Sequence, residues 1–215
     1  MDIAMVGLGK MGGNMAERLA RGGHRVLGFD LDAAAVAEAA SEGVVTFDSV
    51  PEMVASLASP RVVWMMVPAG DIVDRVIADI APALQSGDVI VDGGNSNYKD
   101  TVRRSGDLLE SGIHLVDVGT SGGVWGLAEG YSMMAGGADD AIAILRPALE
   151  TLAPTPDTGW GHVGASGSGH FVKMIHNGIE YGLMEAYAEG FALLRAKDDF
   201  GLDLAQVADI WRTGS

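Results

Sequence analysis

The 215-residue sequence contains no cysteine, and only 6% of its residues are aromatic. Without cysteine, the chain can form neither a disulfide nor a thiolate nucleophile, and it cannot bind a metal through sulfur. Its five histidines are scattered and show no H-x-x-x-H or similar ligand spacing. We therefore predict no structural metal.

Positive charge is also scarce, because 14 Lys and Arg residues stand against 29 Asp and Glu residues, for a net charge of -15. An acidic chain does not attract phosphate backbones, so we expect no nucleic-acid partner. Charges and glycines interrupt every apolar run before it reaches the length of a membrane span. The sequence also starts directly with an apolar stretch and shows no signal-peptide pattern. We expect a soluble, cytoplasmic protein with no membrane partner.

Glycine, in contrast, is abundant at 31 residues. The first cluster, Gly7-Leu8-Gly9-Lys10-Met11-Gly12, stands between an apolar strand at residues 2–6 and a helical pattern from Asn14. In a G-x-G-x-x-G loop the first glycine permits the tight turn, the second admits a pyrophosphate, and the third lets the helix pack closely. The helix N-terminus then faces the pyrophosphate. The order strand, glycine loop, helix predicts dinucleotide binding by residues 7–12.

Asp30 ends the next expected strand, at residues 25–29. A carboxylate there can accept hydrogen bonds from ribose hydroxyls and repels a 2′-phosphate, and no Arg follows it. This favours NAD over NADP as the cofactor, with NADP the weaker ligand. The alternative use of Asp30, as a helix N-cap, is better served by Asp32.

Strand and helix patterns continue to alternate along the chain. Near-continuous apolar strands between helices indicate a parallel sheet covered on both faces. The fold class is therefore α/β, a Rossmann-type doubly wound sheet. The expected helices are 33–41, 50–57, 71–84 and 139–152, and the expected strands are 43–47, 61–67, 88–92, 113–118 and 131–135, with an irregular edge at 155–163.

Three loops at the expected carboxyl ends of strands are candidates for ligand contacts. Two of them are Val67-Pro68-Ala69-Gly70 and Asp92-Gly93-Gly94-Asn95-Ser96-Asn97. The second suits a tight turn with side chains free for a ligand, and a plain N-capped turn is the alternative. The third, residues 119–130, surrounds Ser121 with glycines and suggests a backbone nest for an anion. An ordinary connecting loop is the alternative there.

A long helix is expected to follow Gly164 and to run to about Leu194, with a short helix at 203–212. At 100° per residue, Lys173, Asn177 and Glu180 lie on one face of that helix. The rest of the segment is apolar and indicates a buried helix, and Lys and Glu are seldom buried without a task or a partner. The group is either a structural Lys–Glu pair or an acid/base pair aimed into a cleft, and the preceding motifs favour the second.

With these motifs assembled, the chain resembles the β-hydroxyacid dehydrogenase superfamily and, most closely, its 6-phosphogluconate dehydrogenase family in the short bacterial form. The resemblance covers nearly the whole chain. Its most specific parts are the Asp92-Gly-Gly-Asn95-Ser96 turn, Ser121-Gly122-Gly123, and Lys173-Met-Ile-His176-Asn177-Gly-Ile-Glu180-Tyr181.

The resemblance implies the role of each site residue. Lys173 is implied to be the general base and Glu180 the general acid. The residues implied to contact the sugar acid are Asn95, Ser121, Gly122, Gly123, His176, Asn177 and Tyr181. Met11, Val67, Ala69 and Asn95 are implied to flank the nicotinamide.

The resemblance also implies the domain plan. We expect a Rossmann domain at 1–165, followed at 166–215 by a long interdomain helix and the shortened start of an all-α C-terminal domain. In the family, the rest of that domain supplies basic residues for the substrate phosphate. The uncovered apolar faces of the last two helices suggest a homo-oligomer, such as a dimer.

The activity implied is the oxidative decarboxylation of 6-phosphogluconate to ribulose 5-phosphate and CO2 with reduction of NAD, a step of the pentose phosphate pathway and of gluconate utilisation. Two alternatives stay open. One is a dehydrogenase of the same superfamily that acts on another small hydroxy acid. The other is a cofactor-binding protein without turnover.

Overall fold

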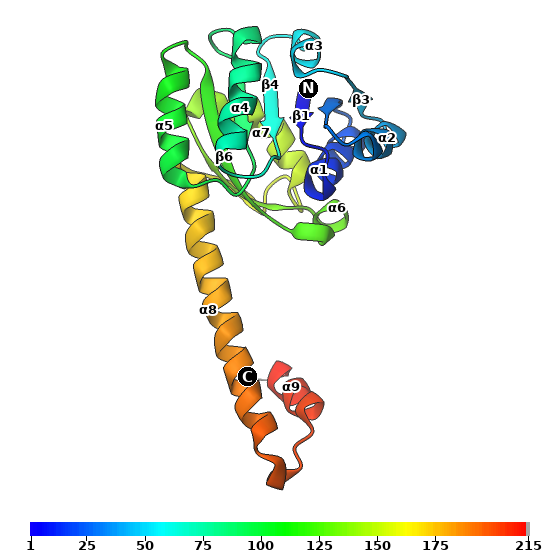
Figure 1. Ribbon diagram of the computed structural model, residues 1–215, viewed down its shortest axis with the longest axis vertical. Coiled ribbons are helices and arrows are strands. Elements are labelled where there is room, and N and C mark those ends of the chain that lie inside the picture. Colours follow the sequence, from blue (N-terminus) through cyan, green and yellow to red (C-terminus); the bar gives the residue numbers. More distant parts are fainter. Residues whose placement is uncertain (214–215) are drawn as a thin grey trace. The chain divides into compact units, whose positions relative to one another are not determined.

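The computed structural model describes residues 1–213 and has one eight-stranded sheet as its centre (Figure 1). The strand order is β3-β2-β1-β4-β5-β6-β7-β8. The first six strands are parallel, β7 is antiparallel to β6, and β8 is parallel to β7. The strands are β1 Asp2–Val6, β2 Arg25–Phe29, β3 Val45–Thr46, β4 Val62–Met65, β5 Val89–Asp92, β6 His114–Ser121, β7 Ser132–Gly136 and β8 Trp160–Gly164.

Helices connect these strands, as parallel pairing requires. They are α1 Lys10–Arg21, α2 Ala33–Ser41, α3 Val50–Ala55, α4 Asp71–Ile80, α5 Tyr98–Leu109, α6 Gly126–Glu129, α7 Asp139–Leu152, α8 Ser168–Ala196 and α9 Leu204–Arg212. Short 3-10 turns occupy Ala81–Ala83, Gly123–Trp125 and Asp198–Phe200.

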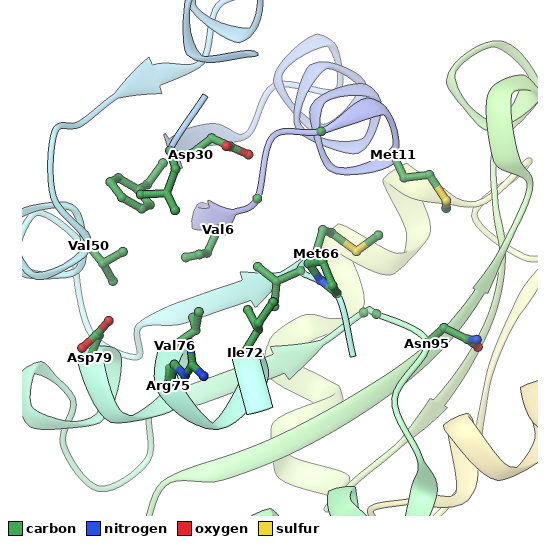
Figure 2. Close-up of a pocket in the computed structure, with 18 of the residues that line it drawn as sticks. Val6, Met11, Asp30, Val50, Met66, Ile72, Arg75, Val76, Asp79 and Asn95 are labelled. Carbon is green, nitrogen blue, oxygen red and sulfur yellow. The ribbon is translucent and has the colours of Figure 1, made fainter. Parts of the chain in front are cut away.

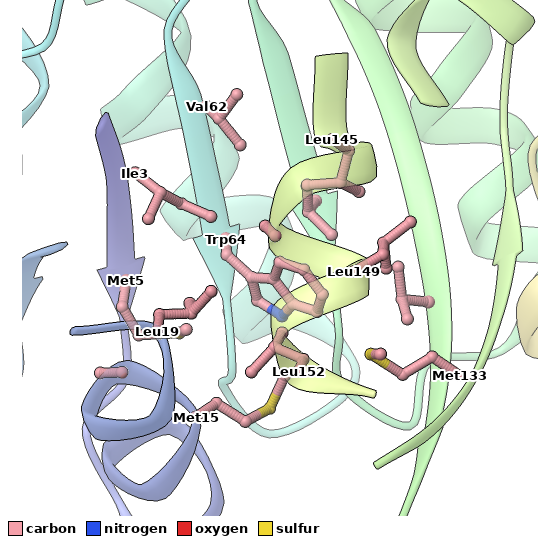
Figure 3. Close-up of a cluster of buried hydrophobic side chains, with 14 of the residues drawn as sticks. Ile3, Met5, Met15, Leu19, Val62, Trp64, Met133, Leu145, Leu149 and Leu152 are labelled. Atoms are coloured by element: carbon pink, nitrogen blue, oxygen red, sulfur yellow. The ribbon is translucent and has the colours of Figure 1, made fainter. Parts of the chain in front are cut away.

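Strand β4 shows why the sheet needs helices on both faces. Its four residues are all buried, and they alternate between two separate cores. Trp64 packs with side chains of α1 and α7, such as Leu19 and Leu149 (Figure 3). Val63 belongs to the opposite core, with side chains from α3, α4 and α5. Each fully buried large side chain stabilises the fold by about 1.5–3 kcal/mol, so neither face can be left open.

The Rossmann-type α/β fold predicted from the sequence is confirmed, with a helical region after it. Asp32 is the N-cap of α2, as expected, and accepts a hydrogen bond from the Ala34 N–H at 2.9 Å. Three local predictions were wrong or incomplete. The edge expected to be irregular contains β8, the region 119–130 contains α6, and helix α5 was not predicted at all.

The chain divides into two compact units, Met1–Lys173 and Met174–Ser215, and Gly214 and Ser215 lie outside the described residues. The predicted domain boundary at 165/166 stays a prediction. In the second unit, the expectation of a buried helix was wrong. Ile179, Leu183 and Met184 are 61%, 57% and 57% exposed, and the Phe191 and Trp211 rings of the same unit pack edge to face at 5.6 Å. Within residues 1–213, no helix is both long and apolar enough to cross a bilayer.

Candidate functional site

A cavity of about 1080 Å³ opens where β1, β2, β4, β5 and β6 end (Figure 2). Parallel sheets bind ligands at this edge, where the strand order reverses between β1 and β4. The lining includes, in chain order, Gly7, Gly9, Met11, Asp30, Asp48, Val67, Arg75, Asp79, Asn95, Thr120 and Lys173.

The cavity has two ends, which we name after one residue each. The Asp30 end comprises Asp30, Asp48, Arg75 and Asp79, and the Lys173 end comprises Met11, Asn95, Thr120 and Lys173. Figure 2 shows Asp30 and Asp79 on one side and Met11 and Asn95 on the other. Since β2 and β6 are four strand positions apart, the ends are separated by about 19 Å.

The three motif glycines have the geometry that a dinucleotide loop needs. Gly7 has φ +93°, a conformation that side chains rarely allow. A Cβ on Gly12 would overlap the Gly7 carbonyl oxygen, so α1 can pack against the loop only through glycine. At Gly9, no atom beyond its chain neighbours lies within 4 Å of where a Cβ would stand. That space, at the N-terminus of α1, is where an anionic group can approach the backbone.

Asp30 holds this loop in place. Its Oδ2 accepts a hydrogen bond from the Leu8 N–H at 2.6 Å, and its Oδ1 accepts one from the Asp32 N–H at 2.8 Å. A carboxylate has about four acceptor positions, so it can accept further bonds from a ligand hydroxyl. Leu8 itself is buried and contributes its backbone, while Lys10 is exposed beside the cavity.

The Asp30 end is acidic, and sequence reasoning missed most of it. Asp48 lies before α3, and Arg75 and Asp79 are one turn apart on α4. The periodicity of α4 could have revealed Arg75 and Asp79, because they lie on the same face as the lining residue Ile72.

At the other end, a close crossing of backbones sets the place of Lys173. A Cβ added to Gly119 on β6 would stand 2.5 Å from the Lys173 Cβ and 2.7 Å from the Gly169 carbonyl oxygen. A Cβ on Gly169 would likewise meet the Asp117 carbonyl oxygen at 2.6 Å. The first turn of α8 therefore lies directly on β6, and this brings the partly buried Lys173 into the cavity beside Thr120.

A buried carboxylate fixes the same turn from below. Asp117 accepts hydrogen bonds from the Gly167 N–H at 2.6 Å and the His170 N–H at 2.8 Å. It thus serves as a cap for α8 from a distant strand. Burial raises the pKa of the Asp117 carboxyl, although these N–H bonds oppose the shift. Thr101 on α5 contacts the His170 ring at 2.8 Å and ties a third element to this turn.

In the Asn95 loop, some polar side chains form hydrogen bonds within the fold and one lines the cavity. Ser96 donates to Asp92 Oδ2 at 2.7 Å, and Asn97 caps α5 by accepting from the Lys99 N–H at 3.0 Å. The N-capped turn considered for this loop is therefore present, and Asn95 still lines the cavity. In the other loop, Val67 lines the cavity, while Ala69 is exposed and does not.

Ser121, Gly122 and Gly123 follow Thr120 at the end of β6 but are not among the cavity residues. Gly122 and Gly123 both have positive φ, +143° and +48°. A Cβ on Gly122 would stand 2.9 Å from the Tyr131 ring, so this loop is folded closely over that aromatic side chain.

Four predicted site residues, His176, Asn177, Glu180 and Tyr181, belong to the second unit. They continue helix α8 beyond Lys173, and none of them lines the cavity. His176 Nδ1 lies 3.7 Å from Glu180 Oε2, an ion pair when the histidine is protonated. Their roles stay predictions.

The site fits a dinucleotide cofactor on its own geometry. It offers an open backbone approach at Gly9, a helix N-terminus, a carboxylate at the end of β2 and a cavity long enough to reach Lys173. Gly7 and Gly9 would hold the pyrophosphate, Asp30 the adenosine ribose, and Met11 would lie toward the nicotinamide.

Comparison with family models agrees with this geometry. Residues 2–164 match the NAD binding domain of 6-phosphogluconate dehydrogenase, and residues 169–213 match the C-terminal domain of 6-phosphogluconate dehydrogenase.

Individual relatives extend the comparison. The chain is 47% identical over its full length to an NAD(+)-dependent, decarboxylating 6-phosphogluconate dehydrogenase of Haloferax volcanii, and covers 70% of that protein. It is 37% identical, over 99% of its length, to an NADP(+)-dependent, decarboxylating 6-phosphogluconate dehydrogenase of Bacillus subtilis, of which it covers 47%.

Solved structures give the same picture. A 6-phosphogluconate dehydrogenase of Plasmodium falciparum matches the whole chain with a TM-score of 0.90 and 30% identity, and the match covers 48% of that structure. A 3-hydroxyisobutyrate dehydrogenase of Mycobacterium tuberculosis matches with a TM-score of 0.86 and 32% identity over the whole chain and 71% of that structure.

Proposed function

Because this chain belongs to the 6-phosphogluconate dehydrogenase family, we propose that it catalyses the NAD-dependent oxidative decarboxylation of 6-phosphogluconate to ribulose 5-phosphate and CO2. The family match makes it an oxidoreductase with an NAD(P)-binding domain. The substrate, the preference for NAD and the roles of individual residues are what we propose beyond the family match.

One observation carries the proposal: a single cavity joins the glycine motif and Asp30 to Asn95, Thr120 and Lys173. Oxidising a secondary alcohol requires a base at the hydroxyl and a hydride acceptor at the carbon, both within reach of the substrate. We assign Lys173 as that base and Asn95 as a residue that orients the substrate, because both line this cavity.

When bound, the nicotinamide supplies the hydride acceptor. Lys173, as the neutral amine, accepts the proton of the C3 hydroxyl while the hydride leaves C3. The product is a β-keto acid, which loses CO2 as the electrons of the broken carbon–carbon bond move into an enolate. Lys173, now an ammonium, stabilises the enolate oxygen by charge and hydrogen bonding. Glu180, on the same face of α8 as Lys173, gives a proton to the carbon that lost the carboxylate, which is C2 of the substrate and C1 of ribulose 5-phosphate.

The Asp30 end supports a preference for NAD. Asp30, Asp48 and Asp79 put three carboxylates around the expected ribose, against one guanidinium from Arg75. Like charges would repel a 2′-phosphate there, and the Leu8 and Asp32 N–H groups hold the Asp30 carboxylate in place.

The test is to follow NAD+ and NADP+ reduction, with CO2 trapping, after adding 6-phosphogluconate, 3-hydroxyisobutyrate or glycerate to the purified chain. Reduction of NAD+ with release of one CO2 per NADH, from 6-phosphogluconate alone, is the expected result. Reduction without CO2, or with one of the unphosphorylated acids only, would refute the proposed reaction.

The match to a 3-hydroxyisobutyrate dehydrogenase over 71% of its structure favours a second candidate, the oxidation of another small hydroxy acid at the same base. The two candidates differ in the substrate that reduces NAD+, because oxidation of 3-hydroxyisobutyrate also puts a carbonyl β to a carboxylate and CO2 release alone does not tell them apart. The same substrate panel separates them.

A further inference from the structure

Arg104 on α5 is the most deeply buried guanidinium near the cavity, at 3% exposure. It forms hydrogen bonds with the start of α4. Its Nε and Nη2 donate to the two carboxylate oxygens of Asp74 at 3.1 and 2.6 Å, and Nη2 also donates to the Gly70 carbonyl at 3.0 Å. Gly70 is the N-cap of α4 and ends the Val67–Gly70 loop.

The same side chain faces the neighbouring loop. Its Nη1 lies 3.9 Å from Asp92 Oδ2, and Asp92 is 1% exposed. Asp92 in turn holds the Asn95 loop, because its two oxygens accept from the Gly94 N–H at 3.1 Å and from Ser96 Oγ at 2.7 Å. One guanidinium therefore connects to both loops through carboxylates and a carbonyl.

These two loops meet at the cavity wall. Val67 and Pro68 line the cavity from one, and Gly93, Gly94 and Asn95 from the other. A Cβ added to Gly94 would stand 2.9 Å from the Val67 carbonyl oxygen, so the loops touch through their backbones. A shift of either loop moves the wall against which a nicotinamide and the substrate would lie.

We propose that Arg104 is a positioning residue, which sets the relative placement of the Val67–Gly70 and Asp92–Asn95 loops and thereby the reactive geometry at the Lys173 end. The kinetic part of this proposal rests on the proposed function, whereas the expected change in ligand binding does not. The planar fork of arginine makes two parallel bonds to Asp74 and reaches a third partner, which the ammonium of lysine cannot reproduce. Asp30, which would hold the adenosine ribose, makes its hydrogen bonds to the Leu8 and Asp32 N–H groups and is not part of this network.

The experiment compares Arg104→Lys and Arg104→Met with Arg103→Met. Arg103 is adjacent, 51% exposed, and pairs with the same Asp74 at 2.8 Å, so it matches the loss of charge without the loop contacts. The measurements are kcat and KM with 6-phosphogluconate and NAD+, calorimetric affinity for ADP-ribose and for NADH, and the melting temperature.

We expect both Arg104 variants to lose kcat by about 100-fold, because a displacement of about 1 Å at a reactive centre has that cost. ADP-ribose, which lacks the nicotinamide, should bind within about twofold of wild type, while NADH loses about tenfold, a change of about 1.4 kcal/mol. Arg103→Met should leave all three values near wild type.

An equal loss of ADP-ribose and NADH affinity would overturn the proposal, because it would indicate general destabilisation. So would Arg104→Lys with a kcat like that of Arg103→Met. If Arg104→Met does not fold, the Lys variant decides. If the wild-type chain does not oxidise 6-phosphogluconate, the proposed function fails, and the NADH-to-ADP-ribose affinity ratio still decides the role of Arg104.

Discussion

The two ends of the cavity are built in different ways. The Asp30 end is centred on one βαβ segment, in which the Leu8 N–H donates to a carboxylate 22 residues later. The Lys173 end has four separate segments, joined by contacts such as Gly70 with Arg104, 34 residues apart, and Asp117 with Gly167, 50 residues apart. The Asp30 end is therefore formed mainly by one local motif, whereas the Lys173 end forms only when the whole sheet is assembled.

Replacing Lys173 by Met should have the largest effect, and the effect should be confined to the Lys173 end of the cavity. We expect kcat to drop by about 10³-fold, because loss of a general base costs 10²–10⁴-fold. ADP-ribose affinity, measured by calorimetry, should stay within about twofold. Lys99→Met, an exposed lysine on α5, is the control and should retain wild-type turnover. Near-normal turnover of Lys173→Met would remove lysine from the mechanism.

Gly119→Ala tests whether the sheet itself sets the position of Lys173. The new methyl would stand 2.5 Å from the Lys173 Cβ, so the start of α8 must shift. Overpacking of this kind costs about 1–3 kcal/mol of stability, and we expect kcat to fall by about 10–100-fold. Denaturant unfolding and steady-state kinetics measure the two effects.

Gly106→Ala is the matched control for that variant. Gly106 lies within α5, and the place that an alanine methyl would take is open, with no atom outside the helix's own backbone within 4 Å. Alanine should therefore stabilise the chain there by about 0.5–1 kcal/mol. Equal kcat values for the two alanine variants would contradict the role of Gly119.

Asp30→Asn addresses the opposite end. The asparagine amide has the size of the carboxylate but not its negative charge, so its hydrogen bonds with the Leu8 N–H and with a ribose hydroxyl are weaker. We expect NAD affinity to fall about tenfold, since a hydrogen bond to a charged group contributes about 1.5–3 kcal/mol. The ratio of kcat/KM for NAD+ and NADP+ should move toward NADP+, with kcat at saturating NAD+ nearly unchanged. A large loss of kcat at saturation would mean that the two ends are not independent.

Asp74→Asn should have the smallest effect, a change in acid stability, because the amide oxygen of asparagine still accepts a hydrogen bond from Arg104. Hydrogen bonding to Arg104 holds the pKa of the Asp74 carboxyl well below its usual range. Its contribution to stability is therefore complete above the unfolded-state value of about 4 and is lost as pH falls below it. The side chain is 39% exposed, so solvent screening keeps the contribution modest.

Melting temperatures from pH 7 to pH 3 check this prediction. The variant should melt below wild type at pH 7, and the difference should shrink below about pH 4. A difference that stays constant across the range would exclude a titrating Asp74.

Sequence reasoning was strong where the signal is local. The glycine motif, Asp30 and the alternation of strands and helices follow from short-range patterns, and the fold they predicted is confirmed. Helix α5 was missed because its residues Tyr98–Leu109 are largely polar, although Asn97 is a good N-cap and Thr101, Arg104 and Leu108 follow at helical spacing. Missing α5 also meant missing Arg104, whose partners come from two other segments.

The burial of α8 was misjudged for a related reason. An apolar composition indicates that a helix has something to bury, but not which surface covers it, and Ile179 is 61% exposed in this chain. Lys173 was identified from its helix face, whereas the residues that hold it, Asp117, Gly119 and Gly169, show no pattern until the strand and helix cross.

The crossing of Gly119 and Gly169 makes the position of Lys173 independent of the loop that lies across the cavity from it. Lys173 is located by main-chain contact between a strand and a helix and by the Asp117 carboxylate below its turn, and neither of these contacts involves the Asn95 loop. Substitutions in the Asn95 loop can then change the cavity wall while Lys173 keeps its position on β6.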